Sequence, residues 1–167
     1  MCNIFEEFLN PYSITYMQGI AVFQGKLEGG YVTFYQDDSQ SPVKINVHVK
    51  HLSTGKHGFH IHEKGNLLKK DCSECKGHWN PHNKTHGGLH GENSHAGDLG
   101  NIVANDAGEV KTHISTDKIT LYGKYSIFGR SIIIHVDEDD LGKGGHDDSL
   151  TTGHAGKRFD CAVIGHA

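Results

Sequence analysis

Eight residues, 43–50, alternate apolar and polar side chains without a break and read Val-Lys-Ile-Asn-Val-His-Val-Lys. Because successive side chains of a strand point to opposite faces, this pattern predicts a half-buried β-strand. Weaker patterns of the same kind recur along the rest of the chain. They cover residues 18–25, 30–36, 57–62, 99–104, 110–116, 131–136 and 160–165.

Short polar turns separate these segments, as in Gly29-Gly30, Asp37-Asp38-Ser39 and Asn105-Asp106-Ala107-Gly108. The chain has 22 Gly but only 3 Pro, so most of its turns must depend on glycine. A helical repeat does not persist anywhere over about 12 residues. Many short strands joined by glycine-rich turns predict an all-β sandwich or barrel.

Two stretches interrupt this rhythm. Residues 63–98 are rich in Gly, His, Asn and Lys, and residues 137–157 contain Gly142-Lys143-Gly144-Gly145 and several acids. Long connections without secondary structure of their own are usually functional or disordered. We expect one domain over residues 17–167 with two long functional loops, and residues 1–16 as an N-terminal extension.

The composition argues against several classes of protein. The formal net charge is −4, which argues against nucleic acid as the main partner. The sequence lacks a run of about 18 apolar residues, so it predicts no membrane-spanning helix. Its first residues have no basic flank and no long apolar stretch, unlike a secretory signal. The four cysteines, Cys2, Cys72, Cys75 and Cys161, are too few for a disulfide scaffold, and leftover thiols favour a reducing compartment.

Histidine is the most informative residue type, with 15 in the chain. His60 and His62 stand two apart on a predicted strand, so both imidazoles face the same side. Such a pair alone is more often two exposed histidines on a solvated face. The long loop strengthens the signal, because His78, His82, His86, His90 and His95 fall within 18 residues and Asp98 follows them. Imidazole and carboxylate ligands suit zinc or copper(II).

Seven further motifs stand in a fixed order along the chain. They are Gly58-Phe59-His60-Ile61-His62-Glu63, His78-Trp79-Asn80-Pro81, His86-Gly87-Gly88, His95-Ala96-Gly97-Asp98-Leu99-Gly100-Asn101, Gly129-Arg130 with His135, Asp140-Leu141-Gly142-Lys143-Gly144-Gly145 and the run 156–165. In this order and over roughly residues 17–167 the chain resembles the copper/zinc superoxide dismutases. The resemblance implies an eight-stranded antiparallel Greek-key β-barrel with two long functional loops.

The resemblance also implies two metal sites. Copper would be bound by His60, His62, His78 and His135, and zinc by His78, His86, His95 and Asp98. Two four-coordinate ions need eight ligand positions, which these seven residues supply if one imidazole is shared. The family's shared imidazole corresponds to His78. Taken alone, His135 at the end of a β-branched run is more typical of a structural histidine.

Other residues match positions around the two metals. His82 and His90 match no family ligand, so we expect both to be exposed, and His57 matches a structural position. Asp139 matches the carboxylate that joins copper and zinc ligands through hydrogen bonds. Arg158 matches the arginine that guides the substrate, and Thr152 matches the neighbouring rim of the channel.

The reaction that the resemblance implies is the dismutation of superoxide to oxygen and hydrogen peroxide. One superoxide reduces copper(II) and leaves as oxygen. A second superoxide reoxidises copper(I), takes up two protons and leaves as peroxide. His78 would release copper and carry a proton in the reduced state, whereas zinc does no redox chemistry.

Cys72 and Cys161 match the family's intramolecular disulfide. Cys72 also begins a C-x-x-C motif with Cys75, which could compete for Cys161 or stay free. A thioredoxin-like function for this motif would require a βαβ context, which the strand pattern does not provide. The role of Cys2, in the extension, stays open.

Partners and location follow from the same resemblance. We expect superoxide as substrate, a homodimer, a copper chaperone as a source of metal, and a cytoplasmic location, which would be the host cytoplasm for a viral protein. Gly65 and Gly129 match the family's subunit contact, but Lys64 and His166 replace apolar residues near it. The alternatives are a non-catalytic, copper-chaperone-like relative and a metal-buffering protein. Retention of His135 and Arg158 argues against the first, and turnover with a fixed metal stoichiometry would exclude the second.

Overall fold

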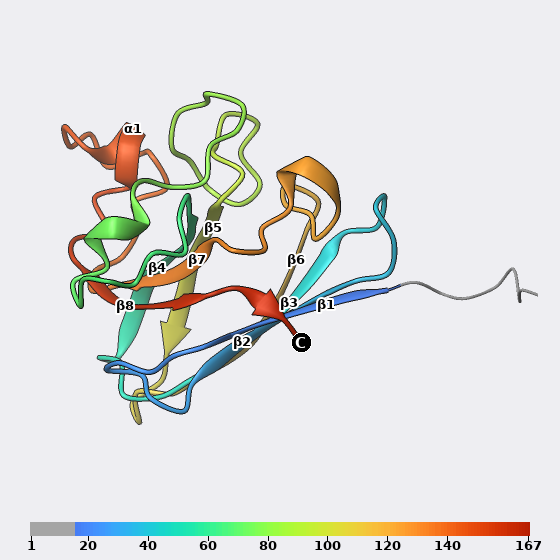
Figure 1. Ribbon diagram of the computed structural model, residues 1–167. Coiled ribbons are helices and arrows are strands. Elements are labelled where there is room, and N and C mark those ends of the chain that lie inside the picture. Colours follow the sequence, from blue (N-terminus) through green and yellow to red (C-terminus); the bar gives the residue numbers. More distant parts are fainter. Residues whose placement is uncertain (1–15) are drawn as a thin grey trace, which may run out of the picture.

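The computed structural model describes residues 16–167 (Figure 1). Its regular secondary structure is almost entirely strand, and long loops connect the strands. The elements are β1 (Met17–Val22), β2 (Tyr31–Gln36), β3 (Val43–Val49), β4 (Gly55–His62), η1 (Ser73–Cys75), β5 (Asp98–Ala104), β6 (Val110–Thr116), η2 (Gly123–Tyr125), β7 (Ser131–His135), α1 (Ser149–Thr152), β8 (Arg158–Val163) and β9 (Gly165–His166). Cys2 lies outside the described residues.

The strands form two antiparallel sheets, with the orders β6-β3-β2-β1-β9 and β5-β4-β7-β8. The chain passes between the sheets four times, at the β3–β4, β5–β6, β6–β7 and β8–β9 connections. The Asn105–Gly108 turn makes the β5–β6 connection, and Ile164 alone separates β8 from β9. The prediction of an all-β Greek-key sandwich is confirmed.

The core lies between the two sheets and follows from the alternation seen in the sequence. On β3, Val43, Ile45, Val47 and Val49 are buried while the residues between them are exposed or half-buried. Phe34 of β2 faces the same core. Burial of a side chain of this size contributes about 1.5–3 kcal/mol relative to leaving it exposed, so this alternation fixes which face of the sheet points inward.

The second sheet differs, because β7 is buried at every position and β4 at its last six. Phe59 and Ile61 of β4 point into the core. The alternate residues His60 and His62 therefore point to the outer face of the sheet. That face is buried because the two long loops, 63–97 and 136–157, fold over it (Figure 1).

The predicted strand bounds lie within two residues of the observed ones, except that β1 ends at Val22 rather than at residue 25. After Val22 the Phe23 amide still bonds to the Gly30 carbonyl, and the chain between them turns. The last predicted strand divides into β8 and the two-residue β9, which pairs with β1 at the edge of the other sheet. In residues 16–167 no helix has the length and apolar character needed to cross a membrane.

Candidate metal centre

Strand register brings three of the predicted ligands onto one face. His60 pairs with Ile133 of β7, so His135, two residues further along β7, lies on the same face as His60. His62 pairs with Ser131 at the opposite end of that strand. Backbone pairing therefore places these three imidazoles on one face of the sheet.

The fourth histidine of this group comes from the long loop. His78 forms an isolated bridge with His62, which holds the loop against the end of β4. One ring nitrogen from each of His60, His62, His78 and His135 lies within 4.8 Å of the others. The ring centroids of His60 and His78 are 4.1 Å apart. All four side chains are buried, so the structure brings together the four residues predicted to bind copper.

A second cluster shares His78 with the first. His78, His86, His95 and Asp98 each offer one atom, and these atoms lie within 4.8 Å of one another. Asp98 Oδ1 lies 2.8 Å from His78 Nδ1, 3.0 Å from His86 Nδ1 and 3.2 Å from His95 Nδ1. Asp98 Oδ2 accepts hydrogen bonds from the amides of Gly87 and His95, which fix the carboxylate. These are the four residues predicted to bind zinc.

Unpaired nitrogens test whether metals fit these clusters. Within residues 16–167, five buried side-chain nitrogen or oxygen atoms make no hydrogen bond: His60 Nδ1, His62 Nε2, His78 Nε2, His86 Nδ1 and His135 Nε2. Of these, His86 Nδ1 still lies 3.0 Å from the Asp98 carboxylate. Leaving a buried polar group unpaired costs about 1–3 kcal/mol. Four of the five belong to the first cluster, one from each histidine, which is the arrangement that a shared ion would satisfy.

The opposite nitrogens of these rings are held in place. His62 Nδ1 donates to the Lys76 carbonyl at 2.8 Å, and His135 Nδ1 donates to the Gly156 carbonyl at 3.3 Å. A hydrogen bond at one ring nitrogen fixes the tautomer and leaves the other nitrogen free to bind a metal. Both carbonyls come from the two long loops, so the loops orient ligands that the strands provide.

Asp139 connects the two clusters. Its carboxylate accepts hydrogen bonds from His60 Nε2 and from His86 Nε2, each at 2.8 Å. Asn101 holds the Asp139 backbone through two hydrogen bonds of 2.8 Å. Gly153, at φ +71°, packs so closely that a Cβ at this position would overlap the carboxylate and the His86 ring. The structure therefore places Asp139 where the sequence predicted a link between the two sites.

Burial and neighbouring charges set the protonation of the first cluster. Burial, reinforced by neighbouring His78, holds the pKa of His60 and of His62 well below the ordinary value. The same causes lower the pKa of His135 to about 4. These imidazoles are therefore neutral at physiological pH, as metal ligands must be.

In the zinc-type cluster, neighbouring charges outweigh burial in setting the pKa values of His86 and Asp98. Burial alone would lower the pKa of His86, but its hydrogen bond to Asp139 and the nearby Asp98 carboxylate raise it to about 9. Burial would raise the pKa of Asp98, yet the imidazoles of His78, His86 and His95 around it hold that pKa far below its usual range. The carboxylate is therefore ionised, and it supplies the negative charge that a divalent cation requires.

Arg158 lies beside the first cluster at the start of β8. It pairs with His135 in the sheet, and its charge contributes to lowering the pKa of His62 and His135. Its guanidinium donates to the carbonyls of Cys72 and Lys76 and is half-buried. Thr152, at the end of α1, is exposed, and its hydroxyl lies 3.3 Å from the Asp148 carbonyl.

A disulfide joins Cys72 to Cys161, which lie 89 residues apart in sequence. It ties the loop before His78 to β8, so the loop carbonyls that hold Arg158 are anchored to the strand that carries it. Cys75 is a buried free thiol that packs in the same cluster as the disulfide. Its Sγ donates to the Asn66 carbonyl at 3.4 Å.

The remaining histidines separate as expected. His82 and His90 are exposed. His57 is buried, and its two ring nitrogens lie 2.9 Å from the His135 carbonyl and 2.8 Å from the Ser53 carbonyl. It therefore links two backbone segments and has no nitrogen left for a metal.

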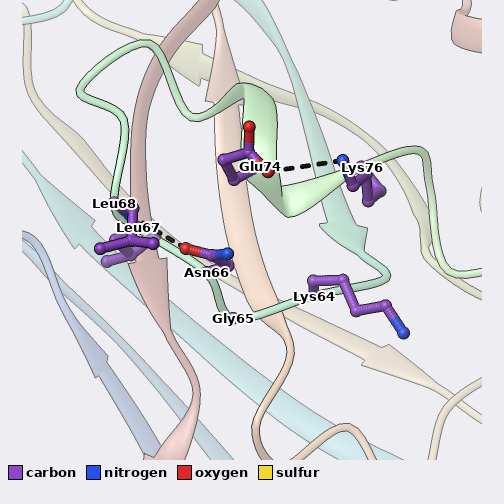
Figure 2. A pocket seen from close by; sticks show the side chains of 7 residues that line it. All are labelled: Lys64, Gly65, Asn66, Leu67, Leu68, Glu74 and Lys76. Carbon is purple, nitrogen blue, oxygen red and sulfur yellow. Dashed lines mark hydrogen bonds and ion pairs between the residues drawn. The ribbon is translucent and has the colours of Figure 1, made fainter.

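Sequence reasoning missed the main-chain part of this site. The Lys76 carbonyl accepts hydrogen bonds from both His62 and Arg158, and nothing in a side-chain pattern could indicate that. Lys76 also borders a surface hollow of about 740 Å³, which is lined by residues 64–68, Glu74 and Lys76 (Figure 2). Glu74 and Lys76 form an ion pair of 3.4 Å there.

The fold and the two clusters define a class of protein, a Greek-key β-sandwich with adjacent three-histidine and four-histidine sites that share one imidazole. The family described as copper/zinc superoxide dismutase matches residues 28–164. The chain is also 45% identical over 148 residues to superoxide dismutase [Cu-Zn] 5 of Dictyostelium discoideum, which covers 89% of this chain and 97% of that protein. The chain belongs to the copper/zinc superoxide dismutase family. Members are oxidoreductases that use copper and zinc to dismutate superoxide.

Proposed function

We propose that this chain dismutates superoxide with copper held by His60, His62, His78 and His135 and with zinc held by His78, His86, His95 and Asp98. The observation that carries the assignment is the set of unpaired buried nitrogens, one on each of the four copper-site histidines. Thiolates are absent from both sets, and imidazole with carboxylate suits copper(II) and zinc.

Copper would supply the one-electron redox chemistry, and zinc would hold the loop without changing its oxidation state. The side chains have separate roles around that chemistry. His78 belongs to both clusters, so its imidazole can carry a proton at Nε2 when that atom is not bound to metal. Arg158 provides a fixed positive charge for the superoxide anion, and Thr152 borders the approach. Asp139 positions His60 and His86 through its two hydrogen bonds.

One experiment separates the two metal sites. Parent, His135→Ala and Asp98→Ala proteins are loaded with both ions, and each sample is divided between metal analysis and a superoxide-dismutation assay. We expect His135→Ala to lose nearly all turnover while zinc stays near stoichiometric. We expect Asp98→Ala to lose zinc affinity and to melt at a lower temperature, because a structural ion stabilises the fold that binds it. His90→Ala, which removes an exposed imidazole, is the matched control.

Three results would contradict the proposal. Full activity in copper-loaded His135→Ala would remove His135 from the copper site. Zinc binding by Asp98→Ala as tight as in the parent would remove Asp98 from the zinc site. Metal bound at fixed stoichiometry without turnover in the parent would favour a non-catalytic relative.

We further propose that residues 17–167 form the catalytic domain and that two copies associate as a homodimer in the cytoplasm, with copper delivered by a chaperone. Support for the dimer comes from Gly65 and Gly129, which match the family's subunit contact and lie together, since a Cβ at Gly65 would overlap the Gly129 carbonyl. His166 stacks on Phe128 next to it, with ring centroids 3.7 Å apart. Sedimentation of the metal-loaded protein tests the dimer, and a single species of 18.3 kDa would exclude it.

A further inference from the structure

Lys118 connects the barrel to the loop that carries the zinc-site ligands. It lies two residues after the end of β6, where its amide donates to Thr116 Oγ1 at 3.2 Å. Its side chain is half-buried rather than extended into solvent. The ammonium donates to the carbonyls of Gly88 and Gly91, each at 3.0 Å, and also to Ser94 Oγ.

These contacts use the full capacity of the side chain. A lysine ammonium has three donors, and all three acceptors belong to one short segment, residues 88–94. The segment is itself turned, since the Gly91 amide donates to the Gly88 carbonyl at 2.9 Å and Ser94 Oγ donates to the Gly91 carbonyl at 3.0 Å. Lys118 therefore fills a small set of inward-pointing oxygens that the turn creates.

The segment held by Lys118, residues 88–94, lies between two ligands of the zinc-type cluster. It runs between His86 and His95, which belong to the zinc-type cluster together with Asp98. A change in the shape of residues 88–94 alters the separation of the two imidazoles. Metal affinity depends on such separations because ligands that are already in place lose less entropy on binding.

The positive charge of Lys118, taken alone, would weaken zinc binding. Its charge lies near Asp98, as the influence of the Asp98 charge on the Lys118 pKa indicates, although burial lowers that pKa overall. A fixed cation close to a divalent ion repels it, and that repulsion would weaken zinc binding. Any tightening of zinc binding by Lys118 must therefore come from the geometry that it imposes on the loop.

We propose that Lys118 is a positioning residue of the zinc site, whose ammonium holds residues 88–94 in the shape that places His86 and His95 for the ion. This inference rests on the zinc ligands proposed above. Groups that orient metal ligands typically change affinity by about 10–100-fold when they are removed. Lys118 acts through the backbone rather than on an imidazole, so we expect the lower end of that range.

The test is a zinc titration of copper-free protein against a chromophoric chelator. We expect Lys118→Met to raise the zinc dissociation constant about tenfold, and Lys118→Arg, which keeps the charge and several donors, to retain most of the affinity. Ser94→Ala is a milder variant, because it removes one of the three acceptors. We expect it to lower the zinc affinity about threefold, roughly the cost of one weak hydrogen bond. Lys124→Met is the matched control, because it removes the same charge from an ammonium that lies over the Tyr125 ring.

Hydrogen exchange in the metal-free proteins distinguishes positioning from a general stabilising role. We expect the amides of residues 86–95 to exchange faster in Lys118→Met and those of β3 to keep their protection. An unchanged or tighter zinc dissociation constant in Lys118→Met would overturn the proposal. So would weaker binding accompanied by faster exchange throughout the barrel. If the parent itself bound zinc weakly, the proposed ligand set would fail instead.

Discussion

Removal of the Cys72–Cys161 disulfide should destabilise the protein by an amount that its position in the chain determines. The two cysteines lie 89 residues apart. In the loop-entropy model, a cross-link that closes about 90 residues restricts the unfolded chain by about 4–5 kcal/mol. For a domain of this size, each kcal/mol lowers the melting temperature by about 2–4 °C. The expected decrease is therefore roughly 8–20 °C.

Cys75 complicates the simplest version of this experiment. It is buried in the same cluster as the disulfide, so in Cys72→Ser it could pair with Cys161 and restore a cross-link of similar length. In Cys161→Ser the remaining pair, Cys72 with Cys75, would close only a short loop. Cys72→Ser and Cys161→Ser should therefore be compared in a Cys75→Ser background, where each removes the same cross-link.

Chemical denaturation of the metal-free proteins is the appropriate assay, because bound metal adds its own stabilisation. We expect the two variants to lose equal amounts of unfolding free energy. Cys75→Ser alone is the control and should keep the disulfide. A loss below about 1 kcal/mol would show that the entropic model fails here. Unequal losses, or peptide mapping that finds Cys75 joined to Cys161 in the parent, would contradict the pairing itself.

Two further predictions concern charge. Arg158→Ala should lower the bimolecular rate with superoxide by about tenfold and remove most of its salt dependence, because a focused positive charge accelerates anion encounter and salt screens it. Pulse radiolysis at several ionic strengths tests this, with Lys157→Ala as the neighbouring control. Equal rates and equal salt slopes in Arg158→Ala and the parent would show that Arg158 does not steer the substrate. The metal-free protein should lose stability as the pH falls from about 6.5 to 4. The pKa of His135 is lowered to about 4 in the folded state, so the unfolded chain takes up a proton first as the pH falls. Denaturation across this pH range should show a smaller decline of the unfolding free energy in His135→Gln than in the parent. An equal decline in both proteins would assign the effect to other groups.

The sequence predicted most clearly those parts of the fold that a periodic side-chain pattern encodes. The alternation at 43–50 became β3 with Val43 and Val49 buried at its ends. The pair His60 and His62 was correctly placed on one strand face, because a period of two depends only on backbone geometry. The two long loops were recognised because they lack such a period. The identity of the family required the motifs themselves, since the histidine spacing indicated a zinc or copper site without indicating a family.

Other features could not be predicted, and the reasons are physical. A strand of two residues such as β9 is too short to carry a period. The carbonyls of Lys76 and Gly156, which orient His62 and His135, belong to the backbone and are independent of the side chain at each position. Lys118 resembles any surface lysine in sequence, because the oxygens that it binds come together only when residues 88–94 turn.

The carboxylate of Asp139 affects how the two sites fill. It contacts an imidazole of each cluster, and His78 belongs to both, so an ion in one cluster orders groups that the other cluster needs. Coupling between binding sites is reciprocal, so zinc must raise the affinity for copper by the same factor by which copper raises the affinity for zinc. The ratio between the copper affinities of zinc-loaded and zinc-free protein should therefore equal the ratio between the zinc affinities of copper-loaded and copper-free protein.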